Sequence, residues 1–166
     1  IPQMRACLRR EPWCLADPEF AFTLPAWRSL IGDAGLVCAF RHPALSAIDV
    51  VSRSAGRIDL ERAFEQWIAA YREILDRHGD RGDWPVVDSD RAGLEGGRVR
   101  LGAFLGTEVD ASFPDPGPLR DVPAGLVVPP AALRLYERHL TRAGPRAAPP
   151  AAAPPSSPPP RIPLRP

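Results

Sequence analysis

The stretch Leu36-Val37-Cys38-Ala39-Phe40-Arg41-His42-Pro43 decides the fold. Its five consecutive apolar residues are typical of a strand that is buried on both faces of a parallel sheet. Proline is tolerated in the first turn of a helix, so the next segment, 43–54, is predicted to be helical. The stretch therefore predicts a strand–helix unit of an α/β domain, with Arg41 at the carboxyl end of the strand.

Apolar spacing on both sides of this unit predicts the other elements. The strongest is a helix over 59–78, with Asp59 as its N-cap and an apolar stripe at three- to four-residue spacing. The remaining candidates are a helix over 20–31 with Thr23 as a cap before Pro25, strands at 13–15 and 84–88, and helices over 98–105 and 130–140. Strands that alternate with helices indicate a mostly parallel sheet flanked by helices. Three strand candidates make an incomplete sheet, and the rest is expected upstream of Ile1, which is not a methionine.

Length and composition bound the organisation and the class of protein. With 166 residues and 45% hydrophobic content, we expect one domain over 1–143 and a disordered Pro/Ala-rich tail over 144–166. The net charge of +1 does not favour nucleic acid or a membrane surface as a partner. No apolar run reaches the length of a membrane span and no signal peptide is recognisable, so a cytoplasmic location is expected.

Cysteine and histidine show no metal-ligand spacing, so no metal site is predicted. Cys14 and Cys38 lie in apolar runs and are predicted to be small buried thiols. All 21 basic residues are arginine, and no lysine is present for a phosphate-binding loop. The Gly96-Gly97 pair is not predicted to form such a loop, because no buried strand is expected to lead into it.

Arg41 is the residue that carries a candidate chemistry. In open α/β sheets, ligands bind at the carboxyl ends of the strands, and a guanidinium there can donate two hydrogen bonds to one phosphate. The alternative is a surface arginine that pairs with a nearby carboxylate. Position alone leaves both interpretations open.

The order of short motifs between about residues 12 and 140 resembles that of bacterial sulfotransferase-like proteins. In that family Lys-Asp-Pro-Arg precedes Leu-x-Leu-x-Leu-Pro-x-Trp, which is similar to the run from Ala16 to Trp27. An apolar strand, Arg-His-Pro and a long helix with a central tryptophan follow, and Arg41, His42, Pro43 and Trp67 match them. The later matches are Val86-Val87-Asp88, Leu101 to Gly106, and Asp115 to Arg120.

The resemblance implies a P-loop-type sulfotransferase fold and the co-substrate 3′-phosphoadenosine-5′-phosphosulfate (PAPS). The activity it implies is transfer of a sulfuryl group to a hydroxyl or amine acceptor. In that family an arginine after the strand and a serine eight residues later bind the 3′-phosphate. Arg41 matches the arginine, but the eighth position is Asp49, so Ser46 or Ser52 is expected to assist. Arg120 is expected to reach the nucleotide.

Three departures favour an alternative, a non-catalytic relative of the same fold that acts as an interaction module or pseudo-enzyme. Asp49 places a carboxylate beside the expected phosphate, and Ala16 and Glu19 replace two family cations. Sulfuryl transfer needs positioned positive charge, so these changes remove chemistry that the reaction requires. The family's loop for the sulfate end is expected upstream of Ile1, and no catalytic base is predicted. Another P-loop nucleotide binder, kinase-like, is a weaker alternative.

Overall fold

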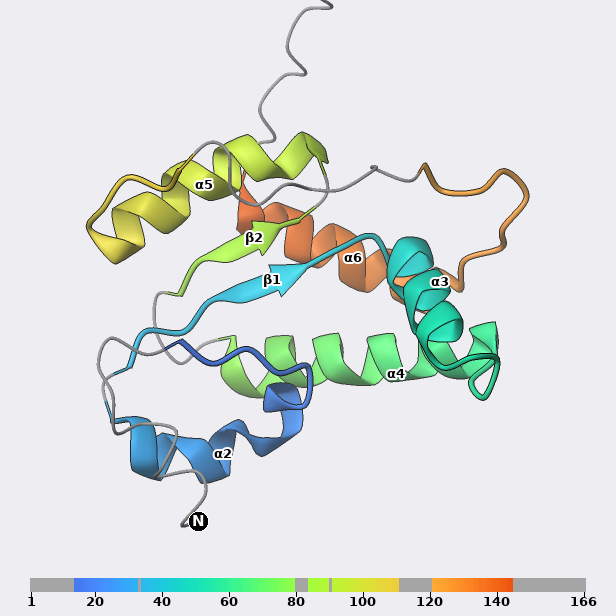
Figure 1. Ribbon diagram of the computed structural model, residues 1–166, viewed down its shortest axis with the longest axis horizontal. Helices are drawn as coiled ribbons and strands as arrows, with labels where there is room; N and C mark the ends of the chain where they lie inside the picture. Colours follow the sequence, from blue (N-terminus) through green and yellow to red (C-terminus); the bar gives the residue numbers. More distant parts are fainter. Residues whose placement is uncertain (1–13, 33, 80–83, 90, 111–120, 145–166) are drawn as a thin grey trace, which may run out of the picture.

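The computed structural model describes residues 14–32, 34–79, 84–89, 91–110 and 121–144, except for the side chains of 91–95. It is a mixed α/β structure with a two-stranded parallel sheet (Figure 1). Along the chain the elements are α2 (Phe20–Ile31), β1 (Cys38–Phe40), α3 (Pro43–Arg53), α4 (Leu60–Glu73), the π-helical turn η1 (Ile74–His78), β2 (Val86–Asp88), α5 (Arg91–Leu105) and α6 (Pro130–Ala143).

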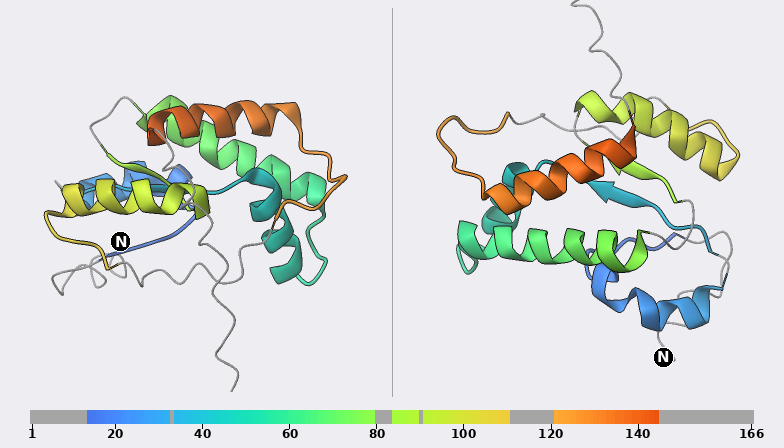
Figure 2. Two further views of the ribbon diagram at one scale, coloured as in Figure 1. Left: turned by 90° about the horizontal axis from the view of Figure 1, so that it is seen from above. Right: turned by 180° about the vertical axis from the view of Figure 1, so that it is seen from behind.

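The sheet lies between two helical layers. Helices α4 and α6 cover one face, and α5 covers the other face over β2 (Figure 2). Helix α2 lies beyond β1 and packs against α4. The parallel register pairs Cys38 with Val86 and Phe40 with Asp88, so both strands end at the same edge of the sheet.

The core forms where α4, η1 and α6 meet the sheet. Phe40 is 1% exposed and contacts the ring of Tyr136 edge-on, at 5.7 Å between centroids. The predicted apolar stripe of α4 contributes Trp67, which is buried, and Tyr71, which packs against it. The other buried members are Cys38, Leu75, Val86, Ala132, Leu135 and Ala143. Burial of these apolar side chains from both helices is what holds the helical layer on the sheet.

The helices predicted from apolar spacing are present, with differences at their ends. Asp59 caps α4, because its side chain accepts a hydrogen bond from the Arg62 amide at 2.8 Å. Helix α5 begins at Arg91, seven residues before the prediction, and α6 extends to Ala143. The last turn of the predicted 59–78 helix is the π-helical turn η1. His78 in this turn contacts α2, because its Nε2 donates a hydrogen bond to the Ala21 carbonyl at 3.2 Å.

Two glycines lie inside α5, and one of them lies against β2. The pair Gly96-Gly97 was expected to follow no strand, yet β2 precedes α5 and both glycines lie inside that helix. A Cβ on Gly97 would lie 2.6 Å from Cγ1 of Val87. The glycine therefore lets α5 approach β2 closely, which offsets its low helix propensity.

Four predictions about the first forty residues are wrong. Strand β1 is three residues long, and Ala39 is exposed, because α5 covers β2 and leaves this face of β1 open. Cys14 is exposed, and it and Leu15 form no strand. Thr23 lies inside α2 and donates to the Glu19 carbonyl at 3.0 Å, so it does not cap the helix. Residues 1–13 and the predicted tail from 145 onward lie outside the described residues.

The two described cysteines should differ sharply in reactivity. Burial raises the pKa of the Cys38 thiol to about 12, whereas Cys14 is exposed. Since the thiolate is the reactive form, Cys38 should react with an aromatic disulfide reagent at pH 8 only on unfolding. Cys7→Ser/Cys14→Ser isolates Cys38, and Cys7→Ser/Cys38→Ser isolates Cys14 as the matched control. Equal labelling rates in the two variants would contradict this burial.

His139 should make the folded state sensitive to acid. Its side chain is fully buried, Nδ1 donates to the Leu135 carbonyl at 2.9 Å, and the ring contacts Phe40 and Tyr71. Burial is the main cause that lowers the pKa of His139 below its usual 6.5. The unfolded chain then binds the proton more readily, so stability present above pH 6.5 is lost as the pH falls below it. Urea denaturation between pH 7.5 and 5 should show a smaller loss for His139→Phe than for the wild type, and equal losses would refute the assignment.

Candidate functional site

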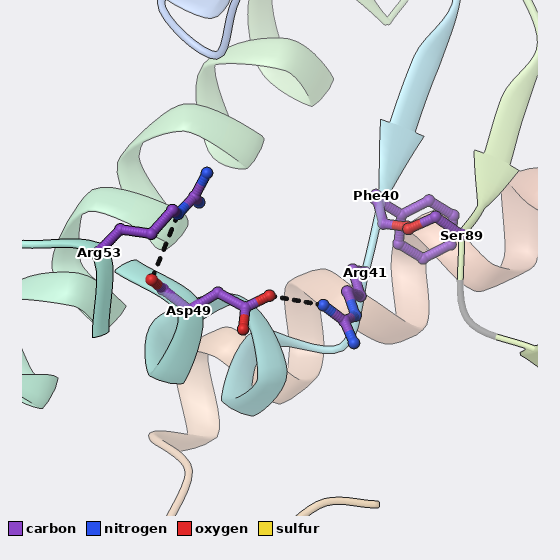
Figure 3. A network of polar contacts seen from close by, with 5 residues as sticks. All are labelled: Phe40, Arg41, Asp49, Arg53 and Ser89. Carbon is purple, nitrogen blue, oxygen red and sulfur yellow. Dashed lines mark hydrogen bonds and ion pairs between the residues drawn. The ribbon is translucent and has the colours of Figure 1, made fainter. Parts of the chain in front are cut away.

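The ends of β1 and β2 form a corner at the carboxyl edge of the sheet, which we call the carboxyl-edge corner and define as Phe40, Arg41, Asp49 and Ser89 (Figure 3). Ser89 follows β2 directly and ties the two strand ends together. Its amide and its hydroxyl both donate to the Phe40 carbonyl, at 2.8 and 2.9 Å. Arg41 therefore leaves the sheet from a fixed point.

The turn from β1 into α3 sets the direction of the helix. His42 has an extended backbone and caps α3, because its Nδ1 accepts a hydrogen bond from the Ala44 amide at 3.2 Å. Pro43 then occupies the first helical turn, where the lack of an amide proton costs nothing. This geometry carries Asp49, two turns along α3, back to the side of Arg41.

Arg41 and Asp49 form an ion pair. The Arg41 Nη1 donates to Oδ2 of Asp49 at 2.7 Å, and the two side chains are 27% and 34% exposed. Arg53 adds a hydrogen bond from its Nε to the Asp49 carbonyl at 3.3 Å, one turn further along α3 (Figure 3). Of the two interpretations that the position of Arg41 left open, the structure shows the second, an arginine paired with a nearby carboxylate.

The other predicted site residues are less closely gathered. Ser46 and Ser52 both lie on α3, on either side of Asp49, with Ser46 half-buried and Ser52 exposed. Arg120 lies outside the described residues. Ala16 and Glu19 are exposed in the segment that enters α2. The structure therefore brings Arg41 together with α3, and it does not place Arg120.

Sequence reasoning missed Ser89. Its signal was present, because a hydroxyl residue directly after a predicted strand must lie at the same sheet edge as the residue after the parallel neighbour. The register is what places it beside Phe40 and not one residue away.

Two titratable groups beside the strands, Tyr71 and Cys38, have pKa values raised by burial. The Tyr71 hydroxyl donates to the Ala39 carbonyl at 3.0 Å, and burial raises its pKa well above the usual range. Cys38 is likewise held as the thiol by burial, which raises its pKa. Both groups keep their protons, so in the folded state they pack and hydrogen-bond without exchanging a proton.

The described residues hold neither a metal-binding cluster nor a helix that could span a membrane. Among them, no three His, Cys, Asp or Glu side chains gather closely enough to hold a metal ion. None of the helices that these residues form combines the length and the apolar character needed to cross a membrane.

Comparisons with known proteins do not place the chain in a family. No family model, no curated protein and no solved structure matches it.

The Arg41–Asp49 ion pair should add little to stability. Both side chains are about a third exposed, and solvent screening limits such pairs to at most ~1 kcal/mol. Asp49→Ser should therefore lower the free energy of unfolding in urea by no more than that amount. A loss of about 3 kcal/mol, the size expected when a buried pair is broken, would contradict the exposed character of the corner.

Proposed function

We propose that the chain is part of a sulfotransferase-like domain in which Arg41 binds the 3′-phosphate of PAPS at the carboxyl end of β1. One observation carries the proposal. Arg41 follows a strand of a parallel sheet directly and precedes a helix that begins two residues later. This is the place where open α/β sheets bind ligands, and the positive end of the α3 dipole adds to the charge of the guanidinium.

The residues fit the 3′-phosphate end of PAPS in part. Arg41 supplies a guanidinium that can hold two phosphate oxygens, and Ser46, in the second turn of α3, or Ser52 would contribute a hydroxyl. Arg120, which precedes α6 in the sequence, would be a further cation for the nucleotide. Asp49 opposes the fit, because an incoming phosphate must displace its carboxylate from Arg41.

The complete reaction would transfer the sulfuryl group of PAPS to a hydroxyl or amine acceptor and release adenosine 3′,5′-bisphosphate. That step requires cations around the sulfate and a base for the acceptor proton. The described residues supply neither in a position that can be named, so no step of the transfer is assigned to them. The proposed role of this chain is to bind the nucleotide.

A second candidate is a non-catalytic relative of the same fold. The 2.7 Å Arg41–Asp49 contact favours it, since the carboxylate already satisfies the guanidinium that would bind phosphate. The loss of the two family cations at Ala16 and Glu19 points the same way. In this candidate the corner is closed by the chain's own side chain and the domain serves as an interaction module.

Replacing Asp49 by the serine of the sulfotransferase-like pattern should open the site. Asp49→Ser removes a competing carboxylate and restores a hydroxyl, so affinity for adenosine 3′,5′-bisphosphate should rise at least about tenfold, the change that one charge-assisted hydrogen bond produces. Isothermal titration calorimetry measures it. Adding Arg41→Ala to this variant should abolish the gain.

Arg77→Ala is the matched control, because Arg77 is also a surface arginine that pairs with a carboxylate, Glu73, at 3.0 Å. It lies on η1, away from the carboxyl edge (Figure 1), so its loss should leave the affinity unchanged. Wild-type binding that requires Arg41 supports the nucleotide-binding domain. Binding that appears only in Asp49→Ser supports the non-catalytic relative, and no binding in Asp49→Ser refutes the role of Arg41.

A further inference from the structure

The outer surface between α4 and α6 carries a cluster of arginines. Arg72 of α4 and Arg134 and Arg138 of α6 line a groove of about 230 Å³, together with Ala131 and Leu135. The two helices lie side by side on the face of the molecule turned toward the viewer in the right-hand view of Figure 2. We call this surface the arginine groove.

The positive charge of the arginine groove is poorly balanced within the described part of the chain. Arg138 approaches Oδ1 of Asp76 at 3.7 Å, a long contact between two half-exposed side chains. Arg72 and Arg134 have no ion-pair or hydrogen-bond partner among the described residues. The carboxylate of Glu73, next to Arg72, is already paired with Arg77 at 3.0 Å.

In the printed sequence no Asp or Glu lies between Glu137 and Pro166. Arg134 and Arg138 are four residues apart on one helix, a spacing at which like charges destabilise the helix. Neither is needed for packing, since both are exposed while Leu135, Tyr136 and His139 form the buried face of α6. An anion bound in the groove would attract both arginines and so offset the repulsion between them.

We propose that the arginine groove binds the phosphate group of a small molecule that carries at least two negative charges. Planar guanidinium groups from two helices can donate paired hydrogen bonds to phosphate oxygens, which a single ammonium group cannot do. The groove is lined by residues of α4 and α6, whereas the carboxyl-edge corner lies at the end of β1 (Figure 3). The two sites use different arginines, so this inference does not rest on the proposed sulfotransferase-like function.

Titration of the full chain with inorganic pyrophosphate at low ionic strength tests the groove. The Arg41→Ala variant serves as the parent, so that the carboxyl-edge corner cannot contribute. In this background Arg134→Ala and Arg72→Ala should each weaken pyrophosphate binding at least about tenfold. Arg62→Ala, which removes an exposed arginine of α4 that already has a partner, Glu65, and does not line the groove, should leave it unchanged.

Circular dichroism should show the same helical content for all variants, because each replaced side chain is exposed. The absence of saturable binding to the Arg41→Ala parent overturns the proposal. An Arg62→Ala loss as large as that of Arg134→Ala also overturns it, since the attraction would then belong to surface charge in general. Inorganic phosphate, compared in parallel, should bind more weakly than pyrophosphate because it carries less charge.

Discussion

The parallel pairing of β1 with β2 is the constraint on which the rest of the structure depends. Its register sets Phe40 opposite Asp88, so the residues that follow the two strands emerge at one edge. Ser89 fixes that edge by donating twice to the Phe40 carbonyl, and α3 then starts from a defined position. The side of the sheet that faces α4 and α6 is filled by apolar side chains, which leaves the carboxyl edge as the place where polar side chains gather.

At that edge one guanidinium has two candidate partners. Asp49 forms a short ion pair with Arg41, and about a third of each of the two side chains is exposed. A phosphate with two charges would attract the same guanidinium more strongly than the carboxylate does. Its binding would also require the loss of hydration water and would be opposed by repulsion from Asp49. The proposed nucleotide-binding domain and its non-catalytic relative therefore share one geometry and differ in which anion Arg41 prefers.

Local sequence signals predicted most of the framework. The three- to four-residue apolar spacing of 59–78 and the Asp59 cap predicted α4, and the apolar run before Arg41 predicted β1 and its carboxyl end. Features that depend on tertiary packing were not predictable in this way. The exposure of Ala39 follows from where α5 lies, and the close approach of α5 to β2 at Gly97 and Val87 depends on how the two elements pack. Pairing of Arg41 with a nearby carboxylate was one of two interpretations, and only the direction of α3 shows that this carboxylate is Asp49.

A crystal structure of Asp49→Ser grown with adenosine 3′,5′-bisphosphate tests the central claim most directly. We expect the 3′-phosphate within hydrogen-bonding distance of the Arg41 guanidinium, beside the first turns of α3. Nucleotide bound elsewhere on the molecule, or an Arg41 side chain that turns away to another carboxylate, would contradict the claim that the carboxyl-edge corner is a phosphate site.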